Sequence, residues 1–122
     1  MNKVDFTESF RQRTKHLTLW VLELFHTLKR VEETRIIGRQ LLRSSSSVAS
    51  NYRAACRARS RAEFYSKISI VVEEADETIF WLEILEEAEL VSSEKIARIK
   101  LEAKEVLYVM SKARKTTSNA KN

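Results

Sequence analysis

The sequence is poor in the residues that interrupt helices, with one glycine, Gly38, and no proline among 122 residues. Because these two residue types mark most turns, a chain so poor in both is typical of an all-α protein. Its length suits a single domain, which we expect to span residues 1–122.

Cys56 is the only cysteine, so no disulfide can form within the chain, and no signal-like apolar segment follows the N-terminus. Charged residues interrupt both of the most apolar stretches, at Glu23 and Glu83, so no run is long enough to cross a bilayer. We therefore expect a cytoplasmic protein without a membrane partner.

Charges of opposite sign are separated along the chain. Seven arginines and no acid lie between Arg35 and Ala62, whereas nine acids and no base lie between Glu73 and Glu94. Two interpretations are open. The arginines and acids pair with each other inside the fold or across subunits, or the arginines form a surface that binds phosphates.

Apolar residues recur at steps of three and four over most of the chain, which predicts four amphipathic helices. The first runs from Phe6 to Leu28, and Thr34 is the predicted N-cap of the second. Four consecutive serines, 44–47, lie inside the second helix, and the apolar positions on both sides of them keep the helical phase. The serines are therefore predicted to be helical rather than a linker, with Ser44 and Ser47 facing neighbouring helices and Ser46 facing solvent.

The remaining two helices are marked by serine caps. Ser60 followed by Glu63 is a capping box that opens the third helix, which we expect to end near Leu90. Ser92 or Ser93 caps the fourth, and the polar tail 116–122 is expected to be disordered. Since short connections make sequential helices antiparallel, the predicted fold is an all-α, up-down-up-down antiparallel four-helix bundle.

The third helix carries more apolar residues than one bundle needs. A second apolar set lies on the side opposite its core-facing residues, and includes Ile70, Phe80, Trp81, Ile84 and Ala88. Exposed apolar surface marks a partner site, and a second copy of the same chain is the commonest partner. We therefore expect a homo-oligomer with Ile70, Trp81 and Ile84 at the interface. The alternative is that the Trp81 ring lies over a neighbouring helix of the same subunit.

Residues for catalysis or metal binding do not form a complete set. Glu23 and His26 have the Glu-x-x-His spacing of di-iron bundles, but the second such motif is absent. The acids near Glu73 are typical of a solvated or ion-paired helix face, and Cys56 has no histidine near it in the sequence. With one glycine, no phosphate-binding glycine-rich loop is possible. We expect no enzyme activity, no metal and no cofactor.

The stretch from Gly38 to Leu85 resembles a family of small four-helix-bundle proteins that are encoded in intervening sequences of bacterial 23S ribosomal RNA genes. The family pattern combines Gln-Leu-x-Arg-Ser, Ser-Ile-x-x-Asn, Ser-x-x-x-Phe, Glu-Ala-x-Glu and Trp-Leu. The residues of this chain that match it are Gln40, Leu41, Arg43, Ser44, Ser47, Val48, Asn51, Ser60, Phe64, Glu74, Ala75, Glu77, Trp81 and Leu82. One departure is Ala54, where the family usually has a glutamate shortly after the asparagine.

The resemblance implies a homopentamer of four-helix bundles with a basic surface and no known catalysis. Related bundle proteins accompany the reverse transcriptases of diversity-generating retroelements and are thought to bind nucleic acid and the polymerase. The resemblance therefore adds an oligomer, nucleic acid and a polymerase to the expected partners.

Two functions follow as hypotheses. The first is a non-enzymatic, oligomeric protein that binds RNA or single-stranded DNA through arginines, which contact phosphates without reading sequence. The arginines predicted to do so are Arg43, Arg53, Arg57, Arg59 and Arg61. Steps of four place Arg53, Arg57 and Arg61 on one helical face if the second helix continues that far. The alternative is a protein-interaction scaffold or an accessory subunit for a polymerase such as a reverse transcriptase, in which the separated charges serve assembly.

Overall fold

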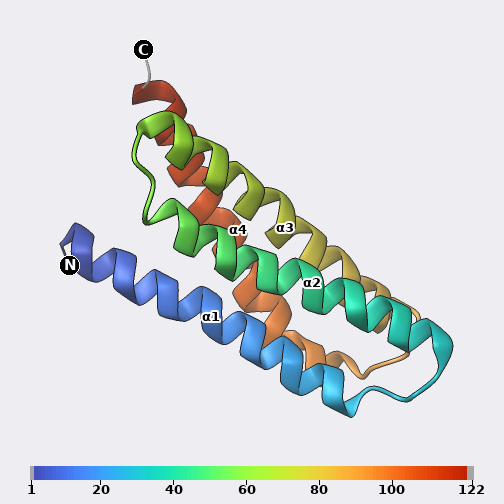
Figure 1. Cartoon of the computed structure of the whole chain (residues 1–122). Coiled ribbons are helices and arrows are strands. Elements are labelled where there is room, and N and C mark those ends of the chain that lie inside the picture. The colour runs from blue at the N-terminus through green and yellow to red at the C-terminus, as the bar shows by residue number, and fades with distance from the viewer. Residues whose placement is uncertain (1, 121–122) are drawn as a thin grey trace.

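Four α-helices account for nearly all of residues 2–120, the part of the chain that a computed structural model describes. They are α1 (Lys3–Thr27), α2 (Glu32–Ala55), α3 (Arg61–Glu87) and α4 (Ser93–Ala120). Sequential helices run in opposite directions, so that the α2–α3 turn lies at the same end of the bundle as both termini, and the other two turns lie at the opposite end (Figure 1). Each helix packs on its two neighbours in the order α1, α2, α3, α4. The predicted up-down-up-down antiparallel four-helix bundle is confirmed.

Three side-chain caps begin helices near the predicted places. The Ser60 hydroxyl accepts a hydrogen bond from the Glu63 amide at 3.0 Å, and that of Ser92 accepts from the Lys95 amide at 3.4 Å. The first helix begins earlier than the predicted Phe6, because the Asn2 side chain caps it and accepts from the Asp5 amide at 2.8 Å. These contacts satisfy amide groups that a helix N-terminus leaves without an intrahelical partner.

The second helix also starts before its predicted cap. It begins at Glu32, and Thr34 lies inside its first turn rather than at the cap. The Thr34 hydroxyl donates back to the carbonyls of Lys29 and Val31, and accepts from the Val31 amide at 3.4 Å. The side chain that was predicted to cap the helix therefore closes the turn that leads into it.

The end of α3 is a turn with a residue in the left-handed conformation. The helix ends at Glu87, before the predicted Leu90, and Glu89 has a φ of 57°. The Leu90 amide bonds the Leu85 carbonyl at 2.9 Å and the Glu89 amide bonds the Glu86 carbonyl at 3.0 Å. This is the hydrogen-bond pattern of a Schellman motif, in which glycine is the usual residue at the left-handed position that Glu89 occupies here.

The fourth helix continues further than expected. Residues 116–120 are helical, where the sequence predicted a disordered tail, and residues 121 and 122 lie outside the described residues. No glycine or proline interrupts this segment, and the Thr117 hydroxyl donates to the Ala113 carbonyl at 2.8 Å. The polarity of the tail therefore did not end the helix.

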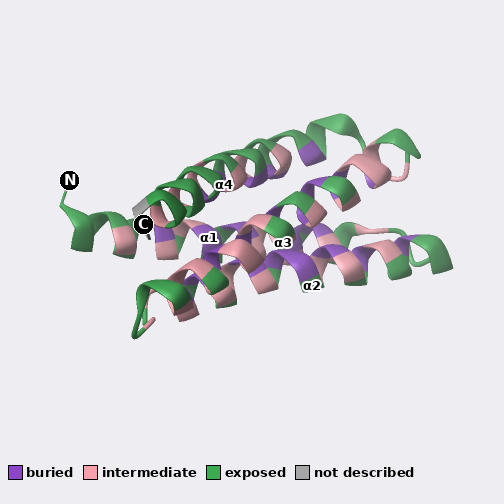
Figure 2. Cartoon of the chain, turned by 90° about the horizontal axis from the view of Figure 1, so that it is seen from above, coloured by how far each residue is buried: buried purple, intermediate pink, exposed green. Residues whose placement is uncertain are grey.

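The core lies along the axis of the bundle, and buried residues face inward on all four helices (Figure 2). Most of the apolar residues predicted to face the core do so. Those with no more than 1% exposure include Leu17, Val21, Leu41, Val48, Ile68, Val71, Leu82, Leu85, Ile96, Val106 and Met110.

Two of the four serines are buried where α2 meets its neighbouring helices. Ser44 is fully buried and accepts a hydrogen bond from the Thr78 hydroxyl of α3 at 3.0 Å. Ser45 is also fully buried, and its carbonyl accepts from the Thr18 hydroxyl of α1 at 2.9 Å. Ser46 is exposed as predicted, whereas Ser47 is only half-buried. The serines thus bring both neighbouring helices close to α2, but the second buried serine is Ser45, not Ser47.

Candidate nucleic-acid interface

One exposed face of α2 carries arginines near both ends of the helix, with the exposed Glu32 at its start. At 3.6 residues per turn, its members lie within about 60° of one another around the helix axis. They are Arg35, Arg39, Ser46, Ser50 and Arg53, all exposed, and we call this set the basic face of α2. The hydroxyls of Ser46 and Ser50 donate to carbonyls within α2, at 3.0 and 3.4 Å. Between the arginines the face therefore has short side chains that leave room for a ligand to approach the helix.

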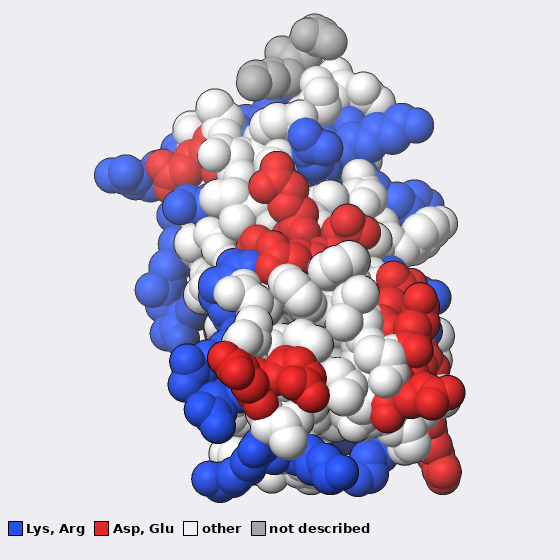
Figure 3. All heavy atoms as spheres, turned by 90° about the vertical axis from the view of Figure 1, so that its right-hand side faces the viewer, with Lys and Arg blue, Asp and Glu red and all other residues white. Residues whose placement is uncertain are grey.

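The arginines of this face have no acidic partner within residues 2–120. Neither Arg35, Arg39 nor Arg53 forms an ion pair in that part of the chain. Figure 3 shows the side that lies to the right in Figure 1, with lysine and arginine along one edge, near the top and at the bottom, where the α1–α2 turn lies. The acids gather in separate groups on this view. On this view basic side chains therefore predominate along that edge and at the bottom.

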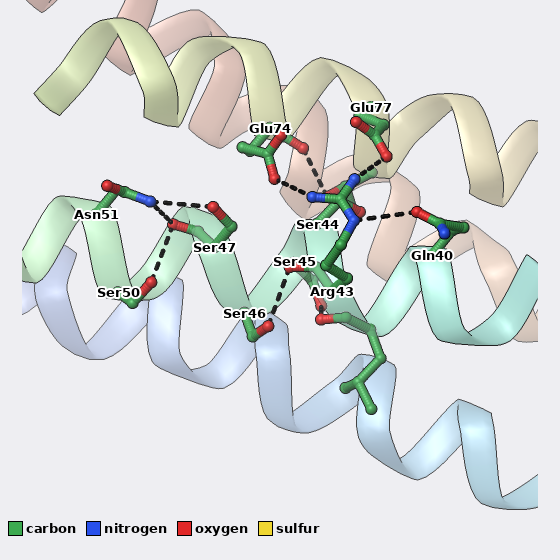
Figure 4. Close-up of polar contacts among 12 residues, drawn as sticks. Gln40, Arg43, Ser44, Ser45, Ser46, Ser47, Ser50, Asn51, Glu74 and Glu77 are labelled. Atoms are coloured by element: carbon green, nitrogen blue, oxygen red, sulfur yellow. Dashed lines mark hydrogen bonds and ion pairs between the residues drawn. The ribbon is translucent and has the colours of Figure 1, made fainter. Parts of the chain in front are cut away.

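Arg43 departs from this pattern, because it turns toward α3 (Figure 4). Its guanidinium lies 2.8 Å from a Glu74 oxygen, also pairs with Glu77, and donates to the Gln40 side chain at 3.0 Å. The hydrogen bond to Glu77 raises the pKa of Arg43. The indole N–H of Trp81 donates to the same Glu77 carboxylate at 2.9 Å, and this bond is the main reason that the pKa of Glu77 is lowered. Arg43 thus joins α2 to α3, and its guanidinium is occupied by contacts within the fold.

The other four predicted arginines gather near the α2–α3 turn. Arg53 lies in the last turn of α2, Arg57 and Arg59 lie in the connection, and Arg61 begins α3. The condition under which Arg53, Arg57 and Arg61 would share one helical face is not met, because α2 ends at Ala55. All four are exposed, and the Arg59 side chain is 90% exposed even though it lies 3.6 Å from Glu63.

The acids of residues 73–94 find their partners elsewhere. Glu74 and Glu77 pair with Arg43, and Glu86 lies 2.7 Å from Lys100 of α4. The sequence left open whether the arginines pair with these acids or bind phosphates. In the described part of the chain, Arg43 pairs with two of these acids. Such pairing does not account for Arg53 or Arg57, which form no ion pair within residues 2–120.

The predicted interface residues of α3 are only partly exposed. Ile70 and Ile84 are half-buried, and Trp81 packs against the core of its own subunit as well as bonding Glu77. The structure therefore agrees with the alternative given for Trp81, in which its ring packs within its own subunit. Phe80 is 47% exposed, and its ring meets that of Trp81 edge to face at a centroid distance of 4.8 Å. Phe80 is the most exposed large apolar residue of α3.

The residues that were considered for metal binding or catalysis do not come together in a site within residues 2–120. Glu23, His26 and Glu73 are exposed, and within residues 2–120 no three histidine, cysteine or acidic side chains are grouped to hold a metal ion. Cys56 is half-buried, and burial raises the pKa of its thiol, which keeps the thiol protonated. Across the described residues, no helix is long and apolar enough to cross a membrane.

Two residues of the basic face were missed by the sequence prediction. Arg35 and Arg39 belong to the stretch from Arg35 to Ala62, which contains seven arginines and no acid, but the sequence prediction does not include them among the phosphate-binding residues. Their signal was their position relative to Ser46 and Arg53, since steps of four and seven place all of them on one side of a continuous helix.

Comparison with known proteins agrees with this architecture. A solved structure of similar fold is a protein of unknown function from the S23 ribosomal protein family of Bacteroides thetaiotaomicron. It has a TM-score of 0.80 and 28% sequence identity, and the match covers 86% of this chain and 97% of that one. Comparison with curated proteins gave no match.

The family model described as 23S rRNA-intervening sequence protein matches residues 9–112. This range contains all of α2 and α3, and with them Gln40, Arg43, Glu74, Glu77 and Trp81, which carried the resemblance in the sequence and meet in one network in the fold. The resemblance is confirmed, and the chain belongs to the family of 23S rRNA-intervening sequence proteins.

Proposed function

We propose that this protein is a non-enzymatic, oligomeric nucleic-acid-binding protein whose ligand is RNA or another single strand. The observation that carries the proposal is the basic face of α2, together with the arginines of the α2–α3 turn. Arg35 and Arg53 are 18 residues apart in one helix, so the face is about 27 Å long at 1.5 Å per residue. Exposed, unpaired guanidinium groups along such a face suit a run of phosphates.

The ligand is bound by its backbone rather than read by its bases. The basic face and the turn arginines contain no aromatic side chain on which a base could stack. Arginine contacts to phosphate position a protein on a strand but carry no sequence information. The expected binding is therefore strongly dependent on salt and weakly dependent on sequence.

The test is a charge-neutralised variant, R35Q/R39Q/R53Q, titrated with single-stranded RNA at several salt concentrations. The slope of log K against log salt is about 0.7 per phosphate neutralised on a single strand, so losing three contacts lowers the slope by about 2. The matched control is K95Q/K104Q/K115Q, which removes the same charge from exposed positions of α4. If both variants lower the slope equally, the binding reflects net charge and not the basic face.

Self-association is part of the proposal, with five subunits as the resemblance implies. The exposed Phe80 next to Trp81, flanked along α3 by the half-buried Ile84, supports an apolar contact between subunits. The same patch supports the second candidate function, a scaffold or an accessory subunit for a polymerase. An R35Q/R39Q/R53Q variant with unchanged RNA binding and lost assembly would favour the scaffold.

A further inference from the structure

A recess of about 300 Å³ lies at the end of the bundle where α1 passes into α2. Its apolar lining comes from Phe25 in the last turn of α1 and from Leu28, which follows that helix. The ring of His26, which also lines the recess, meets the Phe25 ring edge to face at a centroid distance of 6.4 Å. A volume of this size is at the lower limit for sites that take small organic ligands.

The only glycine of the chain makes room for this arrangement. A Cβ atom on Gly38 would lie 2.9 Å from a methyl carbon of Leu28 and 3.1 Å from the Phe25 ring. The buried Thr34 then ties the connection to the helix, since its hydroxyl donates to the carbonyls of Lys29 and Val31. The recess is therefore formed by close packing and by a hydrogen-bonded turn, not by a loose loop.

The lining is strongly basic. Lys29 and Arg30 of the connection and Arg35 and Arg39 of α2 line the recess, and no acid does. Within residues 2–120 none of these four cations forms an ion pair. Arg35 and Arg39 are four residues apart, which places them side by side on α2. Four unpaired cations around a small volume repel one another, and a multiply charged anion relieves that repulsion.

We infer that this recess binds a phosphomonoester with an attached aromatic group, that is, a nucleotide unit. A phosphomonoester carries about −1.5 to −2 charge at neutral pH, more than one phosphodiester link of a strand. Arg35 and Arg39 bind its oxygens through paired N–H donors, Lys29 and Arg30 add charge, and the base lies against Phe25.

Two sources supply this chemistry, a free nucleotide or the phosphorylated end of a strand that lies along the basic face of α2. The second source fits the geometry because the basic face leads to the recess at Arg39 and Arg35. In that form the inference rests on the proposed function. In the free-nucleotide form it does not.

Calorimetric titration with adenosine monophosphate tests the site. Wild-type protein should bind it, and R35Q/R39Q should lose at least about tenfold in affinity, since each hydrogen bond to a charged group contributes about 1.5–3 kcal/mol. K104Q/K115Q is the matched control, with the same loss of charge at exposed positions of α4, and should bind as wild type does. Circular dichroism confirms that both variants are folded.

The contribution of the apolar lining is measured separately with F25L. This variant should bind adenosine monophosphate more weakly than wild type but inorganic phosphate equally well. Equal affinities of wild type and R35Q/R39Q for adenosine monophosphate would overturn the inference. So would an equal loss in both double variants, or inorganic phosphate that binds wild type as tightly as the nucleotide does.

The two sources are separated with short RNAs of one sequence that carry either a phosphate or a hydroxyl at the 5′ end. A phosphate that raises affinity in wild type, but not in R35Q/R39Q, identifies the strand end as the ligand. If long RNA fails to bind while adenosine monophosphate still does, the proposed function is wrong and the recess remains a nucleotide site. If long RNA binds and neither the nucleotide nor the terminal phosphate has an effect, the inference is wrong and the proposed function stands.

Discussion

Replacing Ser44 by leucine tests whether the serines of α2 serve close helix packing. Ser44 is fully buried, and its hydroxyl lies 3.0 Å from that of Thr78 on α3. Leucine adds branched methyl groups where α3 leaves no space, which costs about 1–3 kcal/mol through displaced side chains and backbone. Thr78 keeps an acceptor in the variant, because its hydroxyl also lies 2.8 Å from the Glu74 carbonyl. The loss is therefore one of packing and not of an unsatisfied hydroxyl.

The assay is thermal unfolding followed by circular dichroism, with Ser46→Leu as the matched control. For a domain of this size each kcal/mol lowers Tm by about 4 °C, so Ser44→Leu should lower it by about 4–12 °C. Ser46 is exposed, so the same substitution there meets no neighbouring helix and gains about 0.5 kcal/mol in helix propensity. Equal melting temperatures for the two variants would refute the claim that close packing selects the serine at position 44.

Three further predictions concern α3. Glu89→Gly should stabilise the protein by about 0.5–1 kcal/mol, because glycine adopts the observed φ of 57° without the clash of a Cβ atom; a lower midpoint in urea would contradict this. The pKa of Glu77 is lowered from 4.5, so its stabilising contribution is complete above that pH and is lost as the pH falls through the folded-state value. Melting curves from pH 7 to pH 3 should therefore show a smaller acid-induced loss for Glu77→Gln than for wild type, and identical profiles would rule out this role. Light scattering should give about five times the chain mass of 14.2 kDa for wild type and a lower mass for Phe80→Asp, and a wild-type monomer at tens of micromolar would disprove self-association.

The helices were predictable because their signals are local. Apolar spacing continues through the serines, and Ser60 is a cap of the kind that sequence patterns reveal, so both were identified correctly. The end of α3 was misplaced because Glu89 takes a left-handed conformation that gives no signal when the residue is not glycine. Thr34 was predicted to be the N-cap, three residues after the observed cap Val31, because its hydroxyl bonds the backbone of Lys29 and Val31 before the helix start, which its sequence position does not reveal.

The candidate site depends on contacts that sequence spacing does not specify. Arg43 and Arg53 look alike in the sequence, yet Arg43 lies at the edge of the basic face where the acids of α3 reach it. The recess was not predictable, because it brings Phe25 of α1 against Arg39 of α2 across a turn whose shape depends on Gly38 and Thr34.

The paired hydroxyl contacts at the middle of α2 also limit how far the helices can slide. Thr18 of α1 and Thr78 of α3 bond α2 at the adjacent residues Ser45 and Ser44, so both neighbours are fixed at one height. A shift by one turn, about 5.4 Å, would bring Leu41 or Val48 opposite Thr78 and remove the bond between the Thr78 and Ser44 hydroxyls. Aliphatic side chains can interdigitate at several such offsets, whereas the hydrogen bond between the two hydroxyls, which contributes about 0.5–1.5 kcal/mol, forms at only one of them. The offset of the helices is thus encoded mainly by the hydroxyl pair of Ser44 and Thr78, and the apolar residues around this pair supply the cohesion.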